Sequence, residues 1–320
     1  MITIPTLDDI RDAAEKIKPY IHKTPVMTCQ SINRMAGAEI FFKCENLQKV
    51  GAFKIRGASN AVFSLTEQQC QKGVATHSSG NHAAALALAA RLRNIEAVIV
   101  MPKTAPLVKK EAVKRSGAKI VLSEPTQKDR EKTLEQVAGE KGMTIIHSYD
   151  NPKVIAGQGT SALELLSQAP NLDIVIAPVS GGGLLSGTSI AVKGVSPETQ
   201  VWGAEPEAAN DAYLSLKSGK LVRCDNPQTI ADGLRMSLSE RTFSIIRKNV
   251  TDIITVNEEE IISSMRLVWE RMKIIIEPSS AVPVAAVLKN KKNFSGKRIG
   301  IIISGGNVDL DRLPWMKQNS

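Results

Sequence analysis

The sequence has few aromatic residues, few cysteines and no long apolar run. Phenylalanine, tryptophan and tyrosine make up only 4% of its 320 residues. The hydrophobic fraction is nevertheless 42%, which is ordinary for a globular protein and excludes an intrinsically disordered chain. Since no segment contains the roughly 18 consecutive apolar residues that a transmembrane helix needs, we expect no association with a membrane.

Cysteine and histidine are also scarce, and neither is clustered. The cysteines Cys29, Cys44, Cys70 and Cys224 are widely separated and form no CxxC pair, and there are only four histidines. This pattern argues against a disulfide framework and against a zinc site. The N-terminal segment lacks the basic and apolar stretches of a signal peptide, so we expect a cytoplasmic protein.

The charge is not balanced, because 41 lysines and arginines face 32 acidic residues and leave a net charge of +9. An anionic partner such as a nucleic acid, an acidic membrane or a phosphorylated cofactor would explain this excess. A basic, solvated surface that keeps the protein soluble explains it equally well. Because no nucleic-acid-binding motif accompanies the charge, we favour the surface interpretation and expect no nucleic-acid partner.

Short β-branched segments alternate with helical ones along the whole chain. The segment 82–93, HAAALALAARLR, is typical of the helical stretches. This alternation predicts a doubly wound α/β protein with mostly parallel strands. The expected strands are 38–44, 73–77, 96–101, 118–122, 143–148, 173–179, 200–205, 252–256 and 297–303.

Three of these strands end in unusual turns, where parallel α/β sheets bind their ligands. The turn SGGG at 180–183 precedes a helical segment, and its glycines let backbone N–H groups approach an anion. It matches neither a nucleotide P-loop nor a dinucleotide-binding fingerprint, so a single phosphate ester is the ligand we expect, with a simple packing turn as the alternative. A nucleotide-dependent oxidoreductase is correspondingly disfavoured.

The other two turns and one lysine add further chemistry. SSGN at 78–81 offers donors for a carboxylate or a ring substituent, although serine and asparagine are also ordinary helix caps. SGGN at 304–307 begins with Ser304, which either hydrogen-bonds a ring nitrogen or starts a turn. Lys54 lies in the apolar stretch GAFKIRGA and is either a Schiff-base amine or a surface lysine. Together these four features match the requirements of pyridoxal phosphate.

Seven motifs carry a resemblance that extends over nearly the whole chain. The sequence resembles the fold-type II pyridoxal phosphate enzymes, and within them the group of serine racemases, serine/threonine dehydratases and 3-hydroxyaspartate dehydratases. The resemblance implies two doubly wound open α/β domains with the cofactor between them. Residues 1–72 and 151–320 would form a large domain, and residues 73–150 a small mobile domain whose closure gates the reaction. The motifs are AFKIRGA, SSGNH, AGQGT, SGGGL, ADG, EPSSA and SGGNVDL, in the order and spacing of that group.

The resemblance also implies roles for individual residues around the cofactor. Lys54 would be the lysine that forms the Schiff base, with Phe53 packed beside the ring. Asn81 would bond the ring hydroxyl, and Ser304 the pyridine nitrogen. Ser180 replaces a glycine that many relatives carry, and we expect its hydroxyl to donate to the phosphate. The rest of the phosphate loop would be Gly181, Gly182, Gly183 and Leu184.

Ser79 favours a racemase over a simple dehydratase. Inversion of a stereocentre requires a proton-transfer group on each face, and Lys54 with Ser79 would supply that pair. The resemblance therefore implies interconversion of L- and D-serine, accompanied by β-elimination to pyruvate and ammonia. A serine/threonine dehydratase and a threo-3-hydroxyaspartate ammonia-lyase are the alternatives. The turn that grips the substrate carboxylate would consist of Ser78, Ser79, Asn81 and His82.

Three further expectations follow from the same resemblance. Arg130 would pair with the β-carboxylate of 3-hydroxyaspartate, unless it is merely a solvated helix arginine. Glu205 and Asp211, with the carbonyl of Ala209, match a divalent-cation site that would hold Mg²⁺, or else Ca²⁺ or Mn²⁺, although such a pair is also typical of a solvated loop. We expect a homodimer with a small amino acid as substrate. ATP is a candidate effector, because Lys273 lies in a segment similar to the one that binds ATP in animal serine racemases.

Overall fold

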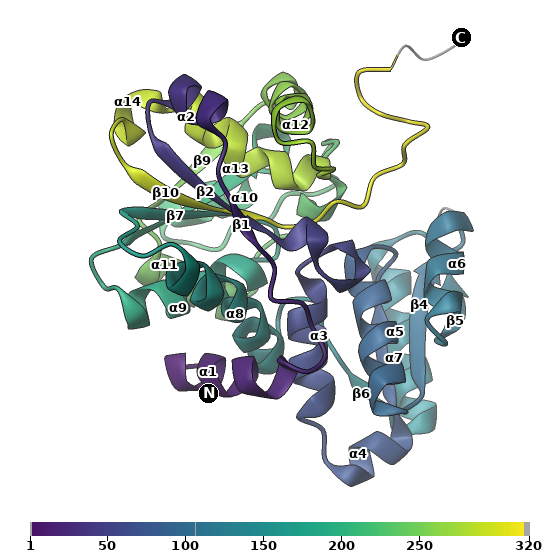
Figure 1. Cartoon of the computed structure of the whole chain (residues 1–320). Coiled ribbons are helices and arrows are strands. Elements are labelled where there is room, and N and C mark those ends of the chain that lie inside the picture. Colours follow the sequence, from purple (N-terminus) through teal and green to yellow (C-terminus); the bar gives the residue numbers. More distant parts are fainter. Residues whose placement is uncertain (1, 106, 317–320) are drawn as a thin grey trace.

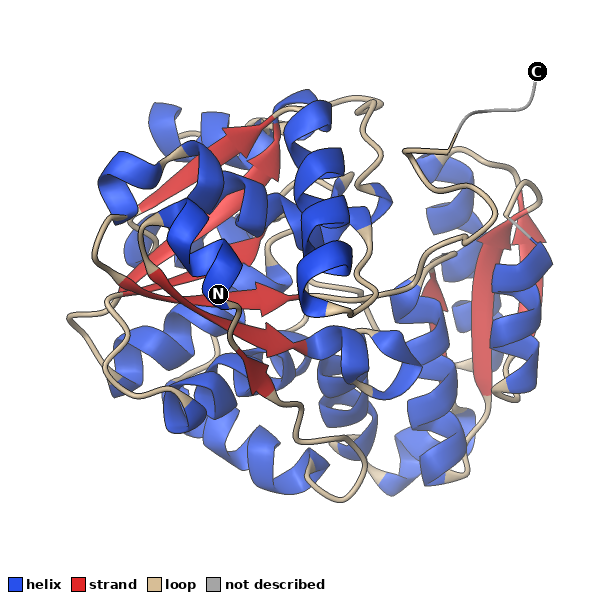
Figure 2. Ribbon diagram, turned by 45° about the horizontal axis from the view of Figure 1, so that its top comes forward, coloured by secondary structure: helices blue, strands red, loops and turns tan. Residues whose placement is uncertain are grey.

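A computed structural model describes residues 2–105 and 107–316 of the chain, and these form two β-sheets with helices on both faces of each (Figures 1 and 2). The doubly wound α/β class expected from the sequence is confirmed. The larger sheet has the strand order β1 (Val26–Met27), β2 (Glu39–Cys44), β10 (Arg298–Ile303), β7 (Ile174–Pro178), β8 (Gln200–Pro206) and β9 (Asp252–Val256). The smaller sheet has the order β5 (Lys119–Ser123), β4 (Ala97–Pro102), β3 (Val74–His77) and β6 (Thr144–Ile145).

The strands are parallel except β1, which pairs antiparallel with β2. Strand β10 runs between β2 and β7, and its Ile301 lies in register with Phe42 and Ile176. Five of its six residues are fully buried, as a central strand covered on both faces must be.

Helices cover both faces of each sheet. Helices α2 (Gln30–Ala36), α12 (Glu258–Met272), α13 (Pro278–Lys289) and α14 (Lys291–Phe294) share one apolar core with the large sheet. On its other face lie α1 (Leu7–Ile17), α8 (Pro152–Gln168), α9 (Gly183–Val195), α10 (Asp211–Ser218) and α11 (Glu240–Asn249). The small sheet packs between α7 (Gln127–Lys141) on one face and α5 (Asn81–Arg93) with α6 (Leu107–Arg115) on the other. The short helix α4 (Glu67–Lys72) leads into β3.

Helix α3 (Lys54–Phe63) lies between the two sheets and contacts both α8 and α5 (Figure 1). Its approach to α8 is close enough to require glycine on both helices. A Cβ atom on Gly57 would lie 2.8 Å from the carbonyl oxygen of Val154, and one on Gly157 would lie 2.6 Å from that of Arg56. Two short 3₁₀ turns, Glu45–Leu47 and Lys49–Gly51, connect β2 to α3.

Two differences from the expected strands have clear causes. Strand β1 was not predicted, because a pair of residues after Pro25 is too short to have a period. The expected strand 143–148 is reduced to Thr144–Ile145, because the chain then leaves the sheet. The N–H groups of Tyr149 and Asp150 turn back to Nδ1 of His147, at 3.4 and 2.9 Å.

The described residues bear on two further expectations. None of the helices in them combines the length and apolarity that crossing a bilayer would require. All four cysteines are described, and each is a free thiol. The domain boundaries at 72/73 and 150/151 stay a prediction, although every strand of the smaller sheet lies between residues 74 and 145.

Candidate active site

The carboxyl ends of β10, β7 and β3 lead into the three turns that the sequence singled out. Lys54 reaches the same region, because the N–H of Phe53 donates to the carbonyl of Ser304 at 2.9 Å. This bond ties the start of α3 to the end of β10, and the isolated bridge between Ala52 and Gly305 reinforces it. Lys54 and Ser304 are therefore neighbours although 250 residues separate them.

Lys54 is the first residue of α3, and its side chain is held by few groups. Its Nζ atom donates to the carbonyl of Ser148 at 3.1 Å and lies 5.2 Å from the centre of the Phe53 ring. Burial lowers the pKa of Lys54 to about 8, against the opposing attraction of the Glu277 carboxylate. A lysine of this kind is partly neutral near pH 8 and can act as a nucleophile or a base.

The predicted phosphate loop forms the start of α9. Gly182 is the N-cap residue, with a φ of +85°, and no side chain caps the helix. A Cβ atom on Gly181 would lie 2.4 Å from the ring of Tyr149, and one on Gly182 would lie 2.7 Å from Leu238. The first N–H groups of a helix have no partner within it, so this uncapped end suits a phosphate.

Ser180 makes its contacts with the backbone of a distant residue. Its hydroxyl accepts from the N–H of Met236 at 3.0 Å and lies 3.3 Å from the same residue's carbonyl. The expected donation from Ser180 to phosphate stays a prediction. Leu184, the last residue assigned to the loop, is buried in the first turn of α9.

The turn after β3 brings Ser78, Ser79 and Asn81 to the start of α5. The Asn81 amide donates to both oxygens of Glu277, at 3.2 and 3.1 Å, and accepts from Nδ2 of Asn307 at 2.9 Å. Asn81 thus connects the small sheet with α13 and with the turn after β10. Ser78 accepts from the N–H of Gly80 at 3.3 Å.

The ring of His82 is buried and hydrogen-bonded within the protein. Its Nε2 lies 3.2 Å from the carbonyl of Ile146, so Nε2 carries the proton and donates. Burial, with a smaller contribution from Lys54, lowers the pKa of His82 to about 3. The side chain is therefore neutral, and only its backbone N–H at the start of α5 is placed to meet a carboxylate.

Ser304 is buried, with 2% of its surface exposed, and its hydroxyl lies 3.0 Å from that of Ser280. Ser304 directly follows β10 and Ser280 lies on α13, and these two elements pack against each other. Sequence reasoning did not single out Ser280, although it belongs to the EPSSA motif.

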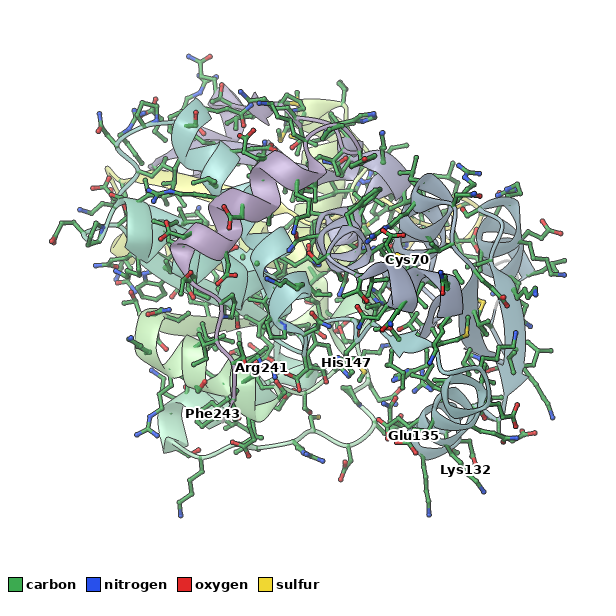
Figure 3. The ribbon with its side chains drawn as sticks, turned by 90° about the horizontal axis from the view of Figure 1, so that it is seen from below. Cys70, Lys132, Glu135, His147, Arg241 and Phe243 are labelled. Atoms are coloured by element: carbon green, nitrogen blue, oxygen red, sulfur yellow. The ribbon has the colours of Figure 1, made fainter. Side chains whose placement is uncertain are left out.

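The aromatic side of the site contains His77, His147 and Tyr149. His147 meets His77 and Tyr149 edge to face, with ring centres 6.3 and 4.5 Å apart. Figure 3 shows His147 near the middle of the molecule, between Arg241 and the helix that carries Glu135. Arg130 of the same helix donates from Nη2 to Gln127 at 2.8 Å, while its buried Nε has no partner among the described residues. Burial lowers the pKa of Arg130.

Glu205 and Asp211 are both buried, as is Ala209 between them. Glu205 accepts from the N–H groups of Ala212 and Tyr213, at 3.2 and 2.9 Å. Burial raises the pKa of Asp211 to about 6, and burial together with Asp211 raises the pKa of Glu205. The Oδ2 atom of Asp211 has no hydrogen-bond partner among the described residues.

This pair fits an oxygen-coordinated cation, which would supply the charge that two buried carboxylates lack. It is a sparse site, however, since the described residues contain no group of three or more histidine, cysteine, aspartate or glutamate side chains arranged to hold a metal. A cation here would complete its coordination with the Ala209 carbonyl and water.

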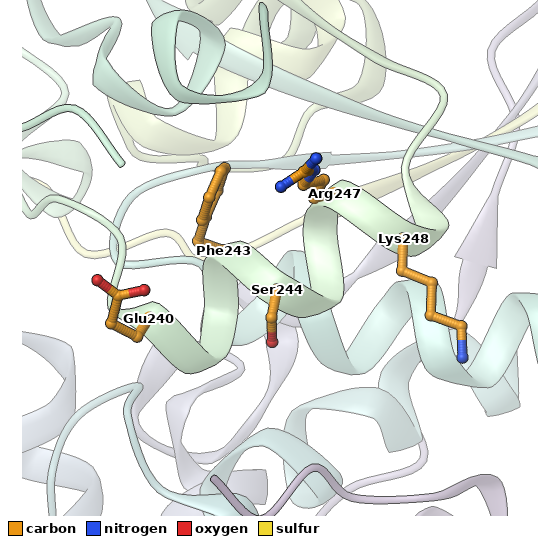
Figure 4. Close-up of a pocket in the computed structure, with 5 residues that line it drawn as sticks. All are labelled: Glu240, Phe243, Ser244, Arg247 and Lys248. Carbon is orange, nitrogen blue, oxygen red and sulfur yellow. The ribbon is translucent and has the colours of Figure 1, made fainter. Parts of the chain in front are cut away.

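A separate hollow lies on the surface of α11 (Figure 4). Its lining is Glu240, Phe243, Ser244, Arg247 and Lys248. All five come from a single helix, and none belongs to the motifs of the sequence. We therefore assign no ligand to it.

The family described as "Pyridoxal-phosphate dependent enzyme" matches residues 17–305. The chain belongs to this family. This pyridoxal-phosphate-dependent enzyme is 51% identical to the beta-hydroxyaspartate dehydratase of Paracoccus denitrificans, over 98% of this chain and 99% of the relative. It is also 51% identical to the serine racemase of Dictyostelium discoideum, over 96% of each chain. The solved structure of maize serine racemase matches with a TM-score of 0.94 and 46% identity, over 97% of this chain and 95% of that one.

The expected fold type and the expectation of pyridoxal phosphate as cofactor are therefore confirmed, and so is the resemblance to serine racemases. Sequence reasoning assigned no role to several further residues at this site of the pyridoxal-phosphate-dependent enzyme, among them Tyr149, Glu277 and Asn307. Glu277 and Asn307 lie in the EPSSA and SGGN motifs, so the motif itself was a usable signal. Tyr149 lies in no motif, and its packing on Gly181 and on the ring of His147 reveals it.

Proposed function

We propose that this enzyme interconverts L- and D-serine and also converts L-serine to pyruvate and ammonia. The proposal rests on one observation: the two proton-transfer groups, Lys54 and Ser79, come from different parts of the fold. Lys54 starts the helix between the sheets, whereas Ser79 lies on the turn that follows β3. Two such groups can face opposite sides of one substrate carbon, as racemisation requires. Similarity to serine racemases supports the same assignment.

The cofactor would be held by the start of α9 and by residues of three other elements. We assign its phosphate to Ser180, Gly181, Gly182, Gly183 and Leu184, its pyridine nitrogen to Ser304 and its ring hydroxyl to Asn81. Phe53 would pack beside the ring. Bound pyridoxal phosphate withdraws electrons and so makes the α-proton of an amino acid acidic.

The residues then divide the work of substrate handling. The substrate carboxylate would bind the turn of Ser78, Ser79 and Asn81 together with the backbone N–H of His82. Neutral Lys54 would take the α-proton on one face, a role that its lowered pKa of about 8 favours. The Ser79 hydroxyl would deliver a proton on the other face. Elimination of the β-hydroxyl needs Lys54 but not Ser79, so both activities are expected from one site.

A second candidate activity is the elimination of ammonia from threo-3-hydroxyaspartate. It is supported by the identity to the Paracoccus denitrificans dehydratase and by Arg130, whose buried Nε has no hydrogen-bond partner in the part of the chain that the structure describes. A β-carboxylate would supply that partner and restore the pKa that burial of Arg130 lowers.

We extend the proposal to a bound metal ion, the location and oligomeric state of the enzyme, and an effector. Glu205, Asp211 and the Ala209 carbonyl would bind Mg²⁺, with Ca²⁺ or Mn²⁺ as substitutes. The enzyme would be a cytoplasmic homodimer. ATP would be an effector near Lys273, which ends α12 with a φ of +60°.

The racemase proposal is tested by Ser79→Ala. Removal of one of two proton-transfer groups should lower L-to-D racemisation at least ~100-fold while L-serine elimination persists. Chiral chromatography and pyruvate release measure the two activities on one sample. Ser78→Ala is the matched control, because it removes a contact to the substrate carboxylate but no proton-transfer group, and it should lower racemisation and elimination by the same factor. Racemisation by Ser79→Ala at the wild-type rate would contradict the proposal.

The hydroxyaspartate activity is tested by Arg130→Gln. Loss of a charge-assisted bond to the β-carboxylate should lower kcat/KM for threo-3-hydroxyaspartate by at least ~10-fold. The value for L-serine, which has no β-carboxylate, should change little. Lys132→Gln on the same helix is the control, because Lys132 is exposed. An equal loss for both substrates would argue against the assigned role of Arg130.

A further inference from the structure

The turn formed by residues 147–150, between β6 and α8, contacts two parts of the predicted cofactor site. The carbonyl of Ser148 accepts from the Nζ atom of Lys54 at 3.1 Å. Tyr149 lies against the predicted phosphate loop: a Cβ atom on Gly181 would lie 2.4 Å from its ring, and one on Gly183 would lie 2.9 Å from its own Cβ atom. The position of this turn therefore determines both where the free amine of Lys54 lies and how the phosphate loop is supported.

Hydrogen bonds within the turn fix its shape. Residues 147–150 lie in no helix or strand. The N–H groups of Tyr149 and Asp150 donate to Nδ1 of His147 at 3.4 and 2.9 Å. Burial lowers the pKa of His147, against the opposing effect of Asp150, so the ring is neutral and its Nδ1 can accept both groups. These bonds do not fix the position of the turn relative to the phosphate loop.

Arg241 attaches the turn to α11. Its Nη1 atom donates to the Asp150 carboxylate, and its Nε atom donates to the carbonyl of Thr3 at 3.0 Å. Both side chains of the ion pair are partly buried, with 19% of Arg241 and 34% of Asp150 exposed, so water screens this pair less than a surface pair. Arg241 is the second residue of α11, and α11 packs against α9, whose first turn belongs to the predicted phosphate loop. The ion pair therefore holds the turn against the part of the fold that carries the phosphate loop.

We propose that Arg241 is a positioning residue that acts through Asp150. The ion pair holds the turn 147–150 so that the carbonyl of Ser148 orients the free amine of Lys54. The inference rests on the proposed role of Lys54 in proton transfer. A neutral amine has two N–H donors and one lone pair. Donation to Ser148 fixes one N–H and leaves the lone pair free to take the α-proton of the substrate.

Loss of the ion pair should affect proton transfer and not substrate binding. In Arg241→Gln, kcat for racemisation and kcat for elimination of L-serine should both fall about ten-fold, because both reactions use Lys54 and one charge-assisted bond is lost. KM for L-serine should change little, because the turn assigned to the substrate carboxylate, residues 78–82, lies elsewhere. Arg241→Lys keeps the charge and should restore most of kcat. An unchanged kcat in Arg241→Gln, or a rise in KM alone, would overturn the role of Arg241.

Hydrogen exchange of the cofactor-loaded enzyme, followed by mass spectrometry, reports on the turn itself. Peptides that contain Tyr149 and Asp150 should exchange at least ~5-fold faster in Arg241→Gln, whereas peptides of β10 should not change. This measurement does not depend on which amino acid the enzyme converts. Unchanged exchange would overturn the inference. Faster exchange in an enzyme that does not racemise serine would support the inference and overturn only the proposed function.

Asp150→Ala tests the path through which Arg241 acts. This variant removes the carboxylate but keeps the bond from Arg241 to Thr3 and the backbone bond from residue 150 to His147. It should reproduce both effects of Arg241→Gln, and the double variant should lose no more than either single variant. Additive losses, or wild-type behaviour of Asp150→Ala, would show that Arg241 does not act through Asp150 and would overturn the inference.

Lys248→Gln is the matched control. Lys248 is an exposed cation on the same helix, so this variant changes the charge of α11 by the same amount. It should leave kcat and the exchange of the turn unchanged. An equal effect in Lys248→Gln would show that the charge of α11, and not the ion pair, is responsible, and would overturn the assignment to Arg241.

Discussion

Lys54 illustrates how position alone changes the chemistry of a residue. Its pKa is lowered to about 8 by burial, although the Glu277 carboxylate partly opposes this effect. Most of the other lysines and arginines in this chain are exposed to solvent, which stabilises their charge. Lys54 instead begins a helix between two sheets, where its amine donates to the carbonyl of Ser148.

This environment predicts a pH-dependent stability of the cofactor-free protein. The pKa of Lys54 is about 8 in the folded chain, against an ordinary value of 10.5 in the unfolded one. Between these pH values the unfolded chain binds more protons, so the contribution of Lys54 to the unfolding free energy rises with pH. Lys54→Met removes the buried charge and should be more stable than wild type by on the order of 2 kcal/mol at pH 7.

The advantage of Lys54→Met should shrink as the pH rises from about 8 toward 10.5, where wild-type Lys54 is neutral in both states. Urea unfolding of the two cofactor-free proteins at several pH values measures the difference. A difference that stays constant with pH would contradict this prediction.

At the scale of elements, a buried group of charges holds α3 in place. Arg56 is fully buried and donates to Glu45 at 2.7 and 2.8 Å and to Glu164 at 2.8 and 2.9 Å. Lys43 of β2 donates to the same Glu164 at 2.5 Å. Two positive and two negative groups thus join β2, α3 and α8, and each has an opposite charge to offset its loss of hydration. Lys54 lies two residues before Arg56, so this network also fixes the start of α3 from which Lys54 projects.

Removal of one partner of such a network leaves a buried charge without full compensation. Glu45→Gln should therefore lower the unfolding free energy by about 3 kcal/mol. The control is Glu270→Gln on α12, where Glu270 pairs with Arg266 at 2.8 Å on the surface, and its loss should lower the unfolding free energy far less. Urea unfolding measures both changes. Equal effects would show that the buried network adds no more than a surface pair.

At the scale of the whole molecule, Asn307 connects the start of α5 with the turn after β10. Asn307 donates to Asn81 at 2.9 Å and to the carbonyl of Val50 at 2.8 Å. Val50 has a φ of +58°, which is unusual for a β-branched residue, and lies just before α3. The side-chain amide of Asn307, in the turn after β10, therefore connects the start of α5 with the strained turn that leads to Lys54.

Asn307→Ala should loosen this connection without disturbing the cores. We expect the backbone amides of residues 79–82 to exchange hydrogen at least ~5-fold faster, because the two hydrogen bonds that the Asn307 side chain donates, to Asn81 and to Val50, are lost. Amides of β10 should be unaffected. Exchange followed by mass spectrometry measures both, with the exposed Asn293→Ala as control. Unchanged exchange in residues 79–82 would show that the connection does not depend on Asn307.

Local pattern was enough to predict most of the fold and the identity of the cofactor. Strands β2, β7 and β10 could be predicted because each is a short, mostly apolar run rich in β-branched or aromatic residues in the sequence. The glycine-rich turns that follow strands could be predicted from local sequence in the same way. A glycine turn at a helix start favours an anion whatever surrounds it. The order and spacing of the motifs then indicated one family, which the comparisons confirm.

Contacts between distant segments were not predictable in this way. The hydroxyl of Ser180 bonds Met236, that of Ser280 bonds Ser304, and the ring of Tyr149 lies against Gly181. Each of these contacts joins two elements whose relative position is set by how the helices pack on the sheets. The residue types carry the chemistry, but the direction of a hydroxyl proton or the pKa of a lysine depends on which groups the packing brings within hydrogen-bond distance.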